Sequence, residues 1–239
     1  MSIKRYRKQD IFSYTLGATL TIELLKKRPD LVLRVFYHSK TEQNEAFFWI
    51  EEICRDHHIP LENNDKAFNI LSEKENCFVI GQFRKFDIKP DCNASHVVLV
   101  NPSNAGNLGT IIRTMVGFEI NNLALIRPAV DIFDPKVVRA SMGALFYLNF
   151  MYFDSFEEYQ KYAGERNIYP FMLGGKESLI EVVFNNPYSL VFGNEASGLP
   201  NEFRNYGQTV LIKHSSSIDS LNLPVAVSIA LYEATKLKF

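Results

Sequence analysis

The chain has 239 residues, of which 46% are hydrophobic and 22% charged, a balance typical of a globular protein with one large or two small domains. Its formal net charge of −1 excludes a uniformly basic surface, so any binding of nucleic acid depends on local patches. The sequence has neither a run of about 18 apolar residues that would span a membrane nor the apolar core of a signal peptide, so we expect a cytoplasmic protein.

Cysteine and histidine usage gives no sign of a metal or redox site. Cys54, Cys77 and Cys92 are widely spaced and include no C-x-x-C pair, which is typical of reduced thiols. His57 and His58 are adjacent and cannot share one face of a helix, and the other histidines are scattered. We therefore expect no bound metal.

The first 88 residues predict a small α/β domain. Between residues 13 and 30, leucines recur at every fourth position and a basic turn precedes Pro29, which indicates one helix. Strands and helices alternate behind it, with strands expected at residues 31–37, 59–61 and 78–83 and helices at residues 42–57 and 66–72. Polar residues without periodicity fill positions 86–95, so we place a domain boundary there.

Residues 95–239 predict a second, larger domain with a mainly parallel sheet, because short apolar strands alternate with helices. The expected strands are residues 96–100, 123–127, 147–153, 168–173, 189–192 and 210–212. The expected helices are residues 108–118, 135–142, 155–166 and 223–237. Ligands in such sheets bind beyond the carboxyl ends of the strands, which directs attention to the loops after Val100, Phe192 and Ile212.

The first of these loops contains Asn107, Gly109 and Arg113. If the helix begins near Leu108, Asn107 can cap it, Gly109 permits close approach of a ligand to the backbone, and Arg113 lies in the second turn. The alternative interpretation is an ordinary capped turn with a surface arginine.

The second loop places Glu195 between Gly193 and Gly198, directly after an apolar strand. Glycines at such a position expose backbone N–H and C=O groups to a ligand. The alternative is a tight turn whose glutamate is only solvated, because loops commonly carry charge for solubility.

The third loop follows Ile212 and is rich in serine. Ser220 and Asn222 precede Pro224, which suits the first turn of the final helix. Both side chains can hydrogen-bond the backbone locally, so the alternative is that they only cap this helix.

Together, the three loops resemble the three sequence motifs of the SpoU (TrmH-type) class of SPOUT RNA methyltransferases, in order and in spacing, over residues 95–239. The matching residues are Asn107, Gly109 and Arg113 in the first motif, Gly193, Glu195 and Gly198 in the second, and Ser220, Leu221 and Asn222 in the third. The first motif departs from the family pattern, in which Asp or Asn and then Pro directly precede the asparagine. Here Asn104-Ala105-Gly106 stands at that place, and Asn101-Pro102 lies three residues earlier.

The resemblance implies an α/β fold whose C-terminal domain is a trefoil knot with a mainly parallel sheet. It also implies transfer of a methyl group from S-adenosylmethionine to a ribose 2′-hydroxyl of rRNA or tRNA. The implied cofactor-binding residues are Gly193, Gly198, Ile212 and Leu221. The implied catalytic residues are Asn107, Arg113, Glu195, Ser220 and Asn222.

Arg113 has two interpretations within this resemblance, because an arginine is too basic to lose a proton readily. Either RNA phosphate and neighbouring groups perturb it enough to act as a base, or it orients the hydroxyl and the phosphate. Both interpretations remain open at this point.

The resemblance further implies a homodimer formed through the final helix, with an active site that draws on both subunits. Ala226, Ala230 and Ala234 recur at every fourth residue and would allow close approach of a second helix, or they form an internal core face. The N-terminal unit is similar in element order to the small ribosomal-protein-like domains that bind RNA substrates. Its basic residues could contact phosphates or interact with helix dipoles: Lys4, Arg5, Arg7, Lys8, Lys26, Lys27, Arg28, Arg84, Lys85 and Lys89.

Two other functions were weighed against this one. A non-catalytic RNA-binding or cofactor-sensing relative of the fold would not need Arg113, Glu195, Ser220 and Asn222 together. An RNA base methyltransferase of another SPOUT branch would not carry this set of three motifs. A P-loop is excluded near Lys176, because both its leading glycine and the Ser or Thr after the lysine are missing.

Overall fold

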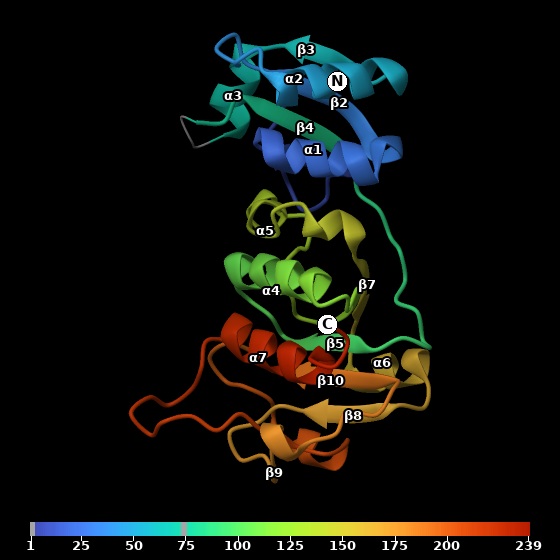
Figure 1. Ribbon diagram of the computed structural model, residues 1–239, viewed down its shortest axis with the longest axis vertical. Helices are drawn as coiled ribbons and strands as arrows, with labels where there is room; N and C mark the ends of the chain where they lie inside the picture. The colour runs from blue at the N-terminus through green and yellow to red at the C-terminus, as the bar shows by residue number, and fades with distance from the viewer. Residues whose placement is uncertain (1–2, 73–75) are drawn as a thin grey trace. The chain divides into compact units, whose positions relative to one another are not determined.

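The computed structural model describes residues 3–72 and 76–239 (Figure 1). The chain forms two compact units: unit 1 consists of Met1–Phe86 with Asp131–Tyr147, and unit 2 of Asp87–Val130 with Leu148–Phe239. The sequence-based ranges, residues 1–88 and 95–239, are not those of the two units: Asp131–Tyr147 belongs to unit 1, and residues 87–94 belong to unit 2.

Unit 1 is built on a four-stranded sheet in the order β1-β4-β2-β3. The strands are β1 (Phe12–Leu16), β2 (Val32–Tyr37), β3 (Leu61–Asn63) and β4 (Val79–Arg84). The helices are α1 (Ala18–Lys27), α2 (Glu45–Asp56) and α3 (Asp65–Leu71), with a short 3-10 turn, η1 (Pro29–Leu31). Neighbouring residues of β2 point to opposite faces: Val35 packs with Ile50 of α2, and Phe36 packs with Phe68 of α3. Helices therefore cover both faces of this sheet.

Strand β1 corrects the sequence-based expectation of a single helix over residues 13–30. Its side chains alternate, with Tyr14 packed in the core below α3 and Thr15 accepting a hydrogen bond from the Gly81 N–H at 2.9 Å. Gly17, with a φ of 129°, then separates the strand from α1. The repeat of leucines runs across this glycine, so the sequence pattern suggests one continuous helix although Leu16 belongs to the strand.

The segment Asp131–Tyr147 contributes α5 (Pro135–Ala140) and η2 (Ala144–Tyr147) to unit 1. The Ser13 hydroxyl donates to the Phe133 carbonyl at 2.6 Å, and the rings of Phe83 and Phe146 meet edge to face at 5.2 Å. A piece of chain from between two strands of unit 2 thus completes the core of unit 1.

Unit 2 contains a five-stranded sheet in the order β7-β6-β5-β10-β8, and every pairing is parallel. The strands are β5 (His96–Val100), β6 (Asn122–Ile126), β7 (Asn149–Phe153), β8 (Asn167–Pro170) and β10 (Tyr188–Phe192). The predicted parallel α/β sheet is confirmed. A short parallel pair, β9 (Glu177–Ser178) with β11 (Val210–Leu211), lies outside it.

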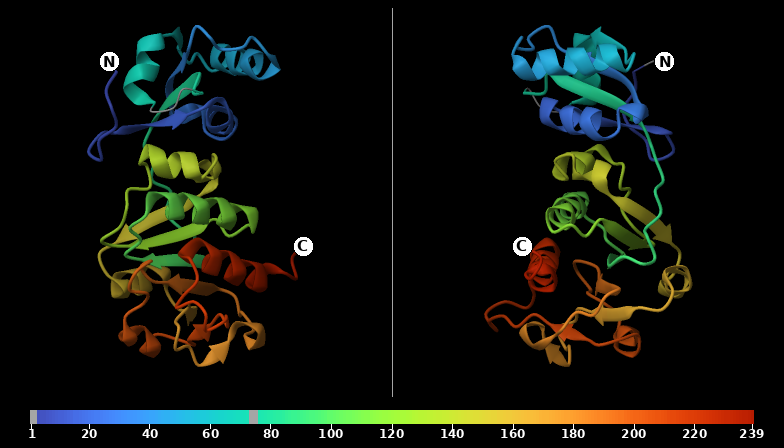
Figure 2. Two further views of the ribbon diagram at one scale, coloured as in Figure 1. Left: turned by 90° about the vertical axis from the view of Figure 1, so that its left-hand side faces the viewer. Right: turned by 45° about the vertical axis from the view of Figure 1, so that its right-hand side comes forward.

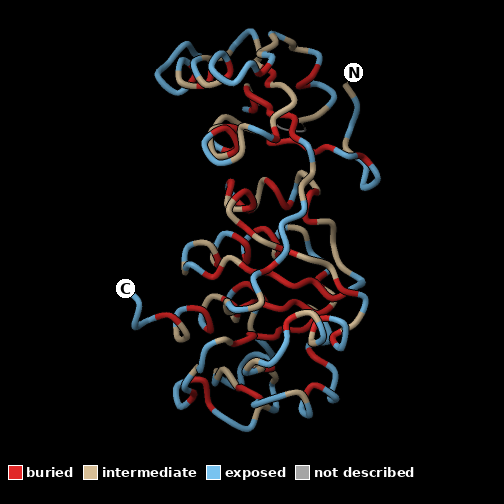
Figure 3. Tube along the Cα trace, turned by 90° about the vertical axis from the view of Figure 1, so that its right-hand side faces the viewer, coloured by how far each residue is buried: buried red, intermediate tan, exposed pale blue. Residues whose placement is uncertain are grey.

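Helices cover both faces of the unit 2 sheet. These are α4 (Ala105–Gly117), α6 (Phe156–Ala163) and α7 (Leu223–Thr235), with two 3-10 turns, η3 (Leu179–Glu181) and η4 (Asn201–Asn205). Figure 2 shows α4 and α7 on one face and α6 on the other. Strands β5, β6 and β10 are buried along their whole length, as the red stretches inside unit 2 in Figure 3 show, which explains their continuous apolar sequences. No helix in the described residues is long and apolar enough to cross a membrane.

Candidate functional site

A cavity of about 380 Å³ lies in unit 2 beyond the carboxyl end of β10. Its walls come from the segments that follow β8, β10 and β11 and from the start of α7. The volume falls in the range of sites that bind small molecules, and the position is where ligands bind in parallel sheets.

Close packing of backbone forms part of the cavity wall. A Cβ atom added to Gly193 would lie 2.0 Å from the carbonyl carbon of Gly198, and one added to Gly175 would lie 2.5 Å from that of Val210. The rings of Phe171 and Phe192 stack at 4.5 Å behind these loops. Only glycine fits at positions 193 and 175, because the backbone of a neighbouring segment occupies the space that a side chain would need, and the loops can therefore pack closely.

All four residues predicted to bind the cofactor line this single cavity: Gly193, Gly198, Ile212 and Leu221. Ser220, predicted as catalytic, also lines it. Asn222 is the N-cap residue of α7 and is exposed, and its side chain makes no capping hydrogen bond within the part of the chain that is described. Helix capping alone therefore does not account for Asn222.

Glu195 joins the second loop to the first. Its Oε2 accepts hydrogen bonds from the Ser103 N–H at 3.1 Å and the Ser103 hydroxyl at 2.9 Å. Its Oε1 accepts from the Asn104 N–H at 3.1 Å and the Asn107 Nδ2 at 3.2 Å. Burial acts to raise the pKa of Glu195, but the backbone and side-chain hydrogen bonds outweigh it and hold that pKa below its ordinary value. The carboxylate is therefore ionised, and both of its oxygens already accept hydrogen bonds.

Helix α4 begins three residues earlier than the sequence indicated, and Asn107 is not its cap. Asn104 occupies the N-cap, and its Oδ1 accepts a hydrogen bond from the Asn107 N–H at 3.0 Å. The Asn107 side chain lies in the first turn and is free to donate to Glu195. The residue that departs from the family pattern, Asn104, thus performs the capping.

Arg113 is exposed on α4 and does not line the cavity. It follows Asn107 by six residues, which places the two side chains about 120° apart around the helix. Among the described residues of one chain, its guanidinium has no hydrogen-bond or ion-pair partner. A single chain brings Asn107 and Glu195 together and leaves Arg113 outside that group.

Ser103 and Asn194 at the site were not singled out from the sequence. Ser103 binds Glu195, as does Asn104, which the sequence showed only as part of the departure from the first motif. Asn194 donates to the Asn101 carbonyl at 2.7 Å, which ties the same two loops. His214, one of the scattered histidines, lines the cavity with its Nδ1 2.9 Å from the Ile212 carbonyl oxygen. The sequence signal that could have identified the loop residues is the row of polar residues that follows β5 and precedes a helix.

The exposed face of α7 is apolar and is not the face that carries the alanines. Ala230 is buried and Ala226 lines the cavity, so these two alanines point into unit 2. Val225, Ile229 and Tyr232 recur at helical spacing on the outer face and are 47%, 38% and 59% exposed. An apolar stripe of this kind is typical of a surface that another protein covers.

The chain was compared with known families and proteins. Residues 94–232 match the model of the SpoU rRNA Methylase family. One relative is the 23S rRNA (uridine(2479)-2′-O)-methyltransferase of Streptomyces viridochromogenes, which is 33% identical over 59% of this chain and 52% of its own length. The chain thus matches about half of that protein. Another is a putative tRNA (cytidine(34)-2′-O)-methyltransferase of Listeria innocua, 31% identical over 59% of this chain and 87% of its own.

Among solved structures, the AdoMet-bound rRNA methyltransferase of Sinorhizobium meliloti is similar along nearly the whole chain. The two superpose with a TM-score of 0.80 at 26% identity, over 96% of this chain and 88% of the other. The similarity therefore includes the N-terminal residues that lie outside the family match.

Proposed function

The chain belongs to the SpoU rRNA methylase family, and from this we propose that it transfers a methyl group from S-adenosylmethionine to a ribose 2′-hydroxyl of RNA. One observation carries the proposal: a single cavity at the carboxyl end of the parallel sheet collects Gly193, Gly198, Ile212, Leu221 and Ser220. Glu195 holds the neighbouring loop against this cavity with both of its carboxylate oxygens.

The residues of the cavity fit S-adenosylmethionine. Leu199, Leu223 and Ala226 supply apolar wall, and Gly193 lets the backbone of Gly198 pack closely against it at the edge of the cavity. Adenine and ribose require such a slot, with a few polar groups to fix their orientation. When bound, the cofactor supplies an electrophilic sulfonium methyl group.

The residues of this chain mainly position the reacting groups. Displacement at a methyl group needs the attacking oxygen in line, so fixed geometry accounts for much of the rate. Glu195 and Asn107 rigidify the loop before α4, and Arg113 orients the ribose hydroxyl and its phosphate. Arginine is suited to this role because it keeps its charge and donates in a planar fork.

A homodimer is part of the proposal. The exposed stripe Val225, Ile229 and Tyr232 lies beside Phe118, the C-cap residue of α4, whose ring is 6.3 Å from that of Tyr232. Arg113 stands exposed on the same helix α4. A second copy packed on the stripe would be adjacent to Arg113 and could supply the site to which this arginine points.

A trefoil knot in unit 2 is also proposed. Strand β10 lies between β5 and β8, although the chain reaches it only after β8. The segment after β8 is joined to β11 by the hydrogen bond from the Met172 N–H to the Val210 carbonyl at 3.0 Å. A knot requires close packing of this kind between segments that are distant in sequence.

Unit 1 is proposed to be a ribosomal-protein-like domain that binds the RNA. Four of the basic side chains singled out from the sequence already have acidic partners: Lys4, Lys26, Arg28 and Lys85. Others in that set are exposed and have no ion pair among the described residues: Arg5, Arg7, Lys8, Lys27 and Arg84. These side chains are available for phosphates.

The test is incubation of the protein with labelled S-adenosylmethionine and, separately, unmodified rRNA and unmodified tRNA. We expect label in 2′-O-methyl nucleosides from one of the two. Both RNAs are needed because one relative is named for rRNA and another for tRNA. Label on a base would indicate a base methyltransferase, and cofactor binding without any transfer would indicate a sensing protein.

A further inference from the structure

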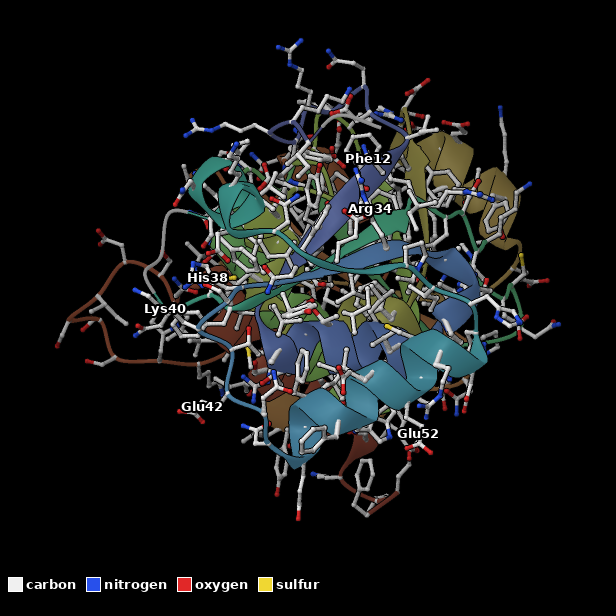
Figure 4. The ribbon with its side chains drawn as sticks, turned by 90° about the horizontal axis from the view of Figure 1, so that it is seen from above. Phe12, Arg34, His38, Lys40, Glu42 and Glu52 are labelled. Carbon is white, nitrogen blue, oxygen red and sulfur yellow. The ribbon has the colours of Figure 1, made fainter. Side chains whose placement is uncertain are left out.

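A second cavity, of about 310 Å³, lies entirely within unit 1 and has no part in the site described above. It is formed by the start of α1, the loop between β2 and α2, the first turns of α2 and the start of β4. Figure 4 shows Lys40 and Glu42 in that loop, and Glu52 towards the other end of α2.

The floor of this cavity is apolar and its rim is polar. Phe47, Ile50 and Val79 line the floor and are at most 2% exposed. The exposed residues at the rim are Lys40, Glu42, Asn44, Ala46 and Asn76. A ligand here would place a flat apolar face inward and polar edges outward.

The polar groups at the rim are available to a ligand. The Asn44 Oδ1 accepts the capping hydrogen bond from the Phe47 N–H at 3.1 Å, which leaves its amide NH₂ as a donor. The side chains of Lys40 and Glu42 make no hydrogen bond or ion pair with any described residue. Helix α1 begins at the cavity with Ala18, and its N-cap, Gly17, has no side chain to satisfy the first N–H groups.

The charge balance selects the type of ligand. Among the described residues that line the cavity there are one cation, Lys40, and one anion, Glu42, so an isolated phosphate is not favoured over a neutral molecule. Carboxylate and amide groups beside an apolar floor match the donors and acceptors on the edge of a nucleobase. Lys40 would then contact the phosphate of the neighbouring nucleotide.

We propose that this cavity binds one unpaired nucleobase of the RNA substrate. The inference rests on the proposed RNA methyltransferase function and names a recognition site for it. Arg84 lies at the far end of β4 from Val79, about 17 Å along the strand. Several stacked nucleotides span that length, so one RNA strand can reach both the cavity and the basic residues Arg7, Lys8 and Arg84.

The test uses the full chain and fluorescent RNA 12-mers of random sequence, single-stranded or annealed to a complement, at one salt concentration. Ala46→Trp fills the mouth of the cavity from an exposed position. We expect it to raise the Kd for single-stranded RNA about tenfold, the effect typical of losing one stacked base. The matched control, Glu52→Trp, adds the same side chain at the far end of α2 and should leave the Kd unchanged.

A second pair of variants guards against an effect of folding. Glu42→Gln changes no volume and should weaken binding of single-stranded RNA severalfold, whereas Glu52→Gln should not. Unfolding temperatures of all variants are compared with that of the parent. The proposal is overturned if Ala46→Trp and Glu42→Gln bind single-stranded RNA as tightly as the parent, or if the parent binds duplex RNA equally well.

Methyl transfer from labelled S-adenosylmethionine is measured on the same preparations, so that the two proposals can fail separately. If the variants lose single-stranded RNA binding and the parent transfers no methyl group, the nucleobase site is supported and the methyltransferase function is refuted. Undiminished RNA binding in the variants of an active enzyme would refute the cavity alone.

Discussion

In the proposed site, the role of Glu195 is to hold a loop in place, without exchanging a proton. Both of its oxygens accept hydrogen bonds from the loop 103–107, and its pKa lies below the ordinary value. Little acceptor capacity remains for a substrate. Its position in front of α4 also places negative charge at the positive end of a helix.

Glu195→Gln should therefore impair binding more than chemistry. The new NH₂ group would face an N–H of Ser103 or Asn104, and one unsatisfied donor of this kind should weaken S-adenosylmethionine binding about tenfold. Calorimetry measures the Kd. Glu202→Gln, an exposed glutamate of the same unit, is the control, and equal affinities for both variants and the parent would contradict the assigned role.

Arg113→Ala should do the opposite. We expect kcat for RNA methylation to fall by about 100-fold or more, the range seen when a group acting at the transition state is removed. The Kd for S-adenosylmethionine should stay within about twofold of the parent, because Arg113 does not line the cavity. Lys161→Ala on α6 serves as control for removal of an exposed charge. Full activity of Arg113→Ala would remove this residue from the catalytic set.

His96 makes the stability of unit 2 depend on pH. It is fully buried, with Nδ1 3.0 Å from the Tyr159 hydroxyl and Nε2 2.8 Å from the Asp91 carbonyl oxygen. Burial, assisted by the charge of Arg166, lowers the pKa of His96 from 6.5 to about 4. The folded protein therefore holds the neutral form, and the unfolded chain takes up a proton first as the pH falls.

The sign of the effect follows from this difference. The contribution of His96 is complete above pH 6.5 and is lost as the pH falls towards 4, with a total on the order of 3 kcal/mol. Urea unfolding between pH 7 and 4 measures it. His96→Gln should be less stable at pH 7 with a shallower pH dependence, whereas the exposed His57→Gln should keep the parental slope.

At the scale of elements, long apolar patterns were predictable from the sequence and short ones were not. The strands β5, β6 and β10 are continuous apolar runs because they are buried on both faces. Strand β1 was missed because a leucine repeat continues across Gly17, and only the backbone of that glycine ends it. Strand β9 has two residues, too few to show any period.

The candidate site was predictable to the same extent. Glycines and short polar residues after strands mark loops that must pack closely, so the lining of the cavity followed from the motifs. The direction of Arg113 did not follow, because a residue on a predicted helix can face any neighbour that the fold supplies. The start of α4 depended on whether Asn104 or Asn107 caps it, and the sequence could not decide because both residues are asparagine.

The apolar outer face of α7 predicts that the chain forms a dimer. Ile229→Asp would place a charge in the stripe of Val225 and Tyr232, so we expect monomers in sedimentation experiments and loss of methyl transfer. Lys161→Asp on α6 should leave both unchanged. A parent chain that is already monomeric at the concentrations used in the activity assay would contradict the dimer.

A shared active site makes a separate prediction. Chains with Arg113→Ala and chains with Gly193→Val should each be inactive alone. The valine would collide with the backbone of Gly198 and so disrupt the wall of the cavity. Mixed after dissociation and reassociation, they should regain measurable activity, because some dimers then combine an intact cavity with an intact arginine. No recovery on mixing would mean that Arg113 serves the cavity of its own chain.

At the scale of the whole molecule, the chain passes between the two units three times, after Phe86, Val130 and Tyr147. Val137, Val138 and Phe146 of the returning segment are buried, and the ring of Phe146 meets that of Phe83 in unit 1. Sequence patterns identified α5 as a helix but could not assign its apolar face to one core or the other, because the spacing is the same in both cases.

Removal of residues 1–86 should therefore damage what remains. We expect the chain 87–239 to aggregate or to bind a hydrophobic dye, because the buried face of α5 and η2 loses its covering. Light scattering and dye fluorescence measure this. Val138→Ser with Phe146→Ser should restore solubility to the shortened chain, and a shortened chain that is fully soluble without them would contradict the shared core.

The same segment limits how this protein can be recombined with its relatives. An RNA-recognition module joined at one linker can be exchanged as a cassette, with a single cut and a single splice. In the proposed assignment of unit 1 as the RNA-binding module, that module contains a return loop whose sequence lies within unit 2, between β6 and β7. A chimera designed to test recognition of another RNA must transplant two stretches of sequence, residues 1–86 and 131–147, as a matched pair.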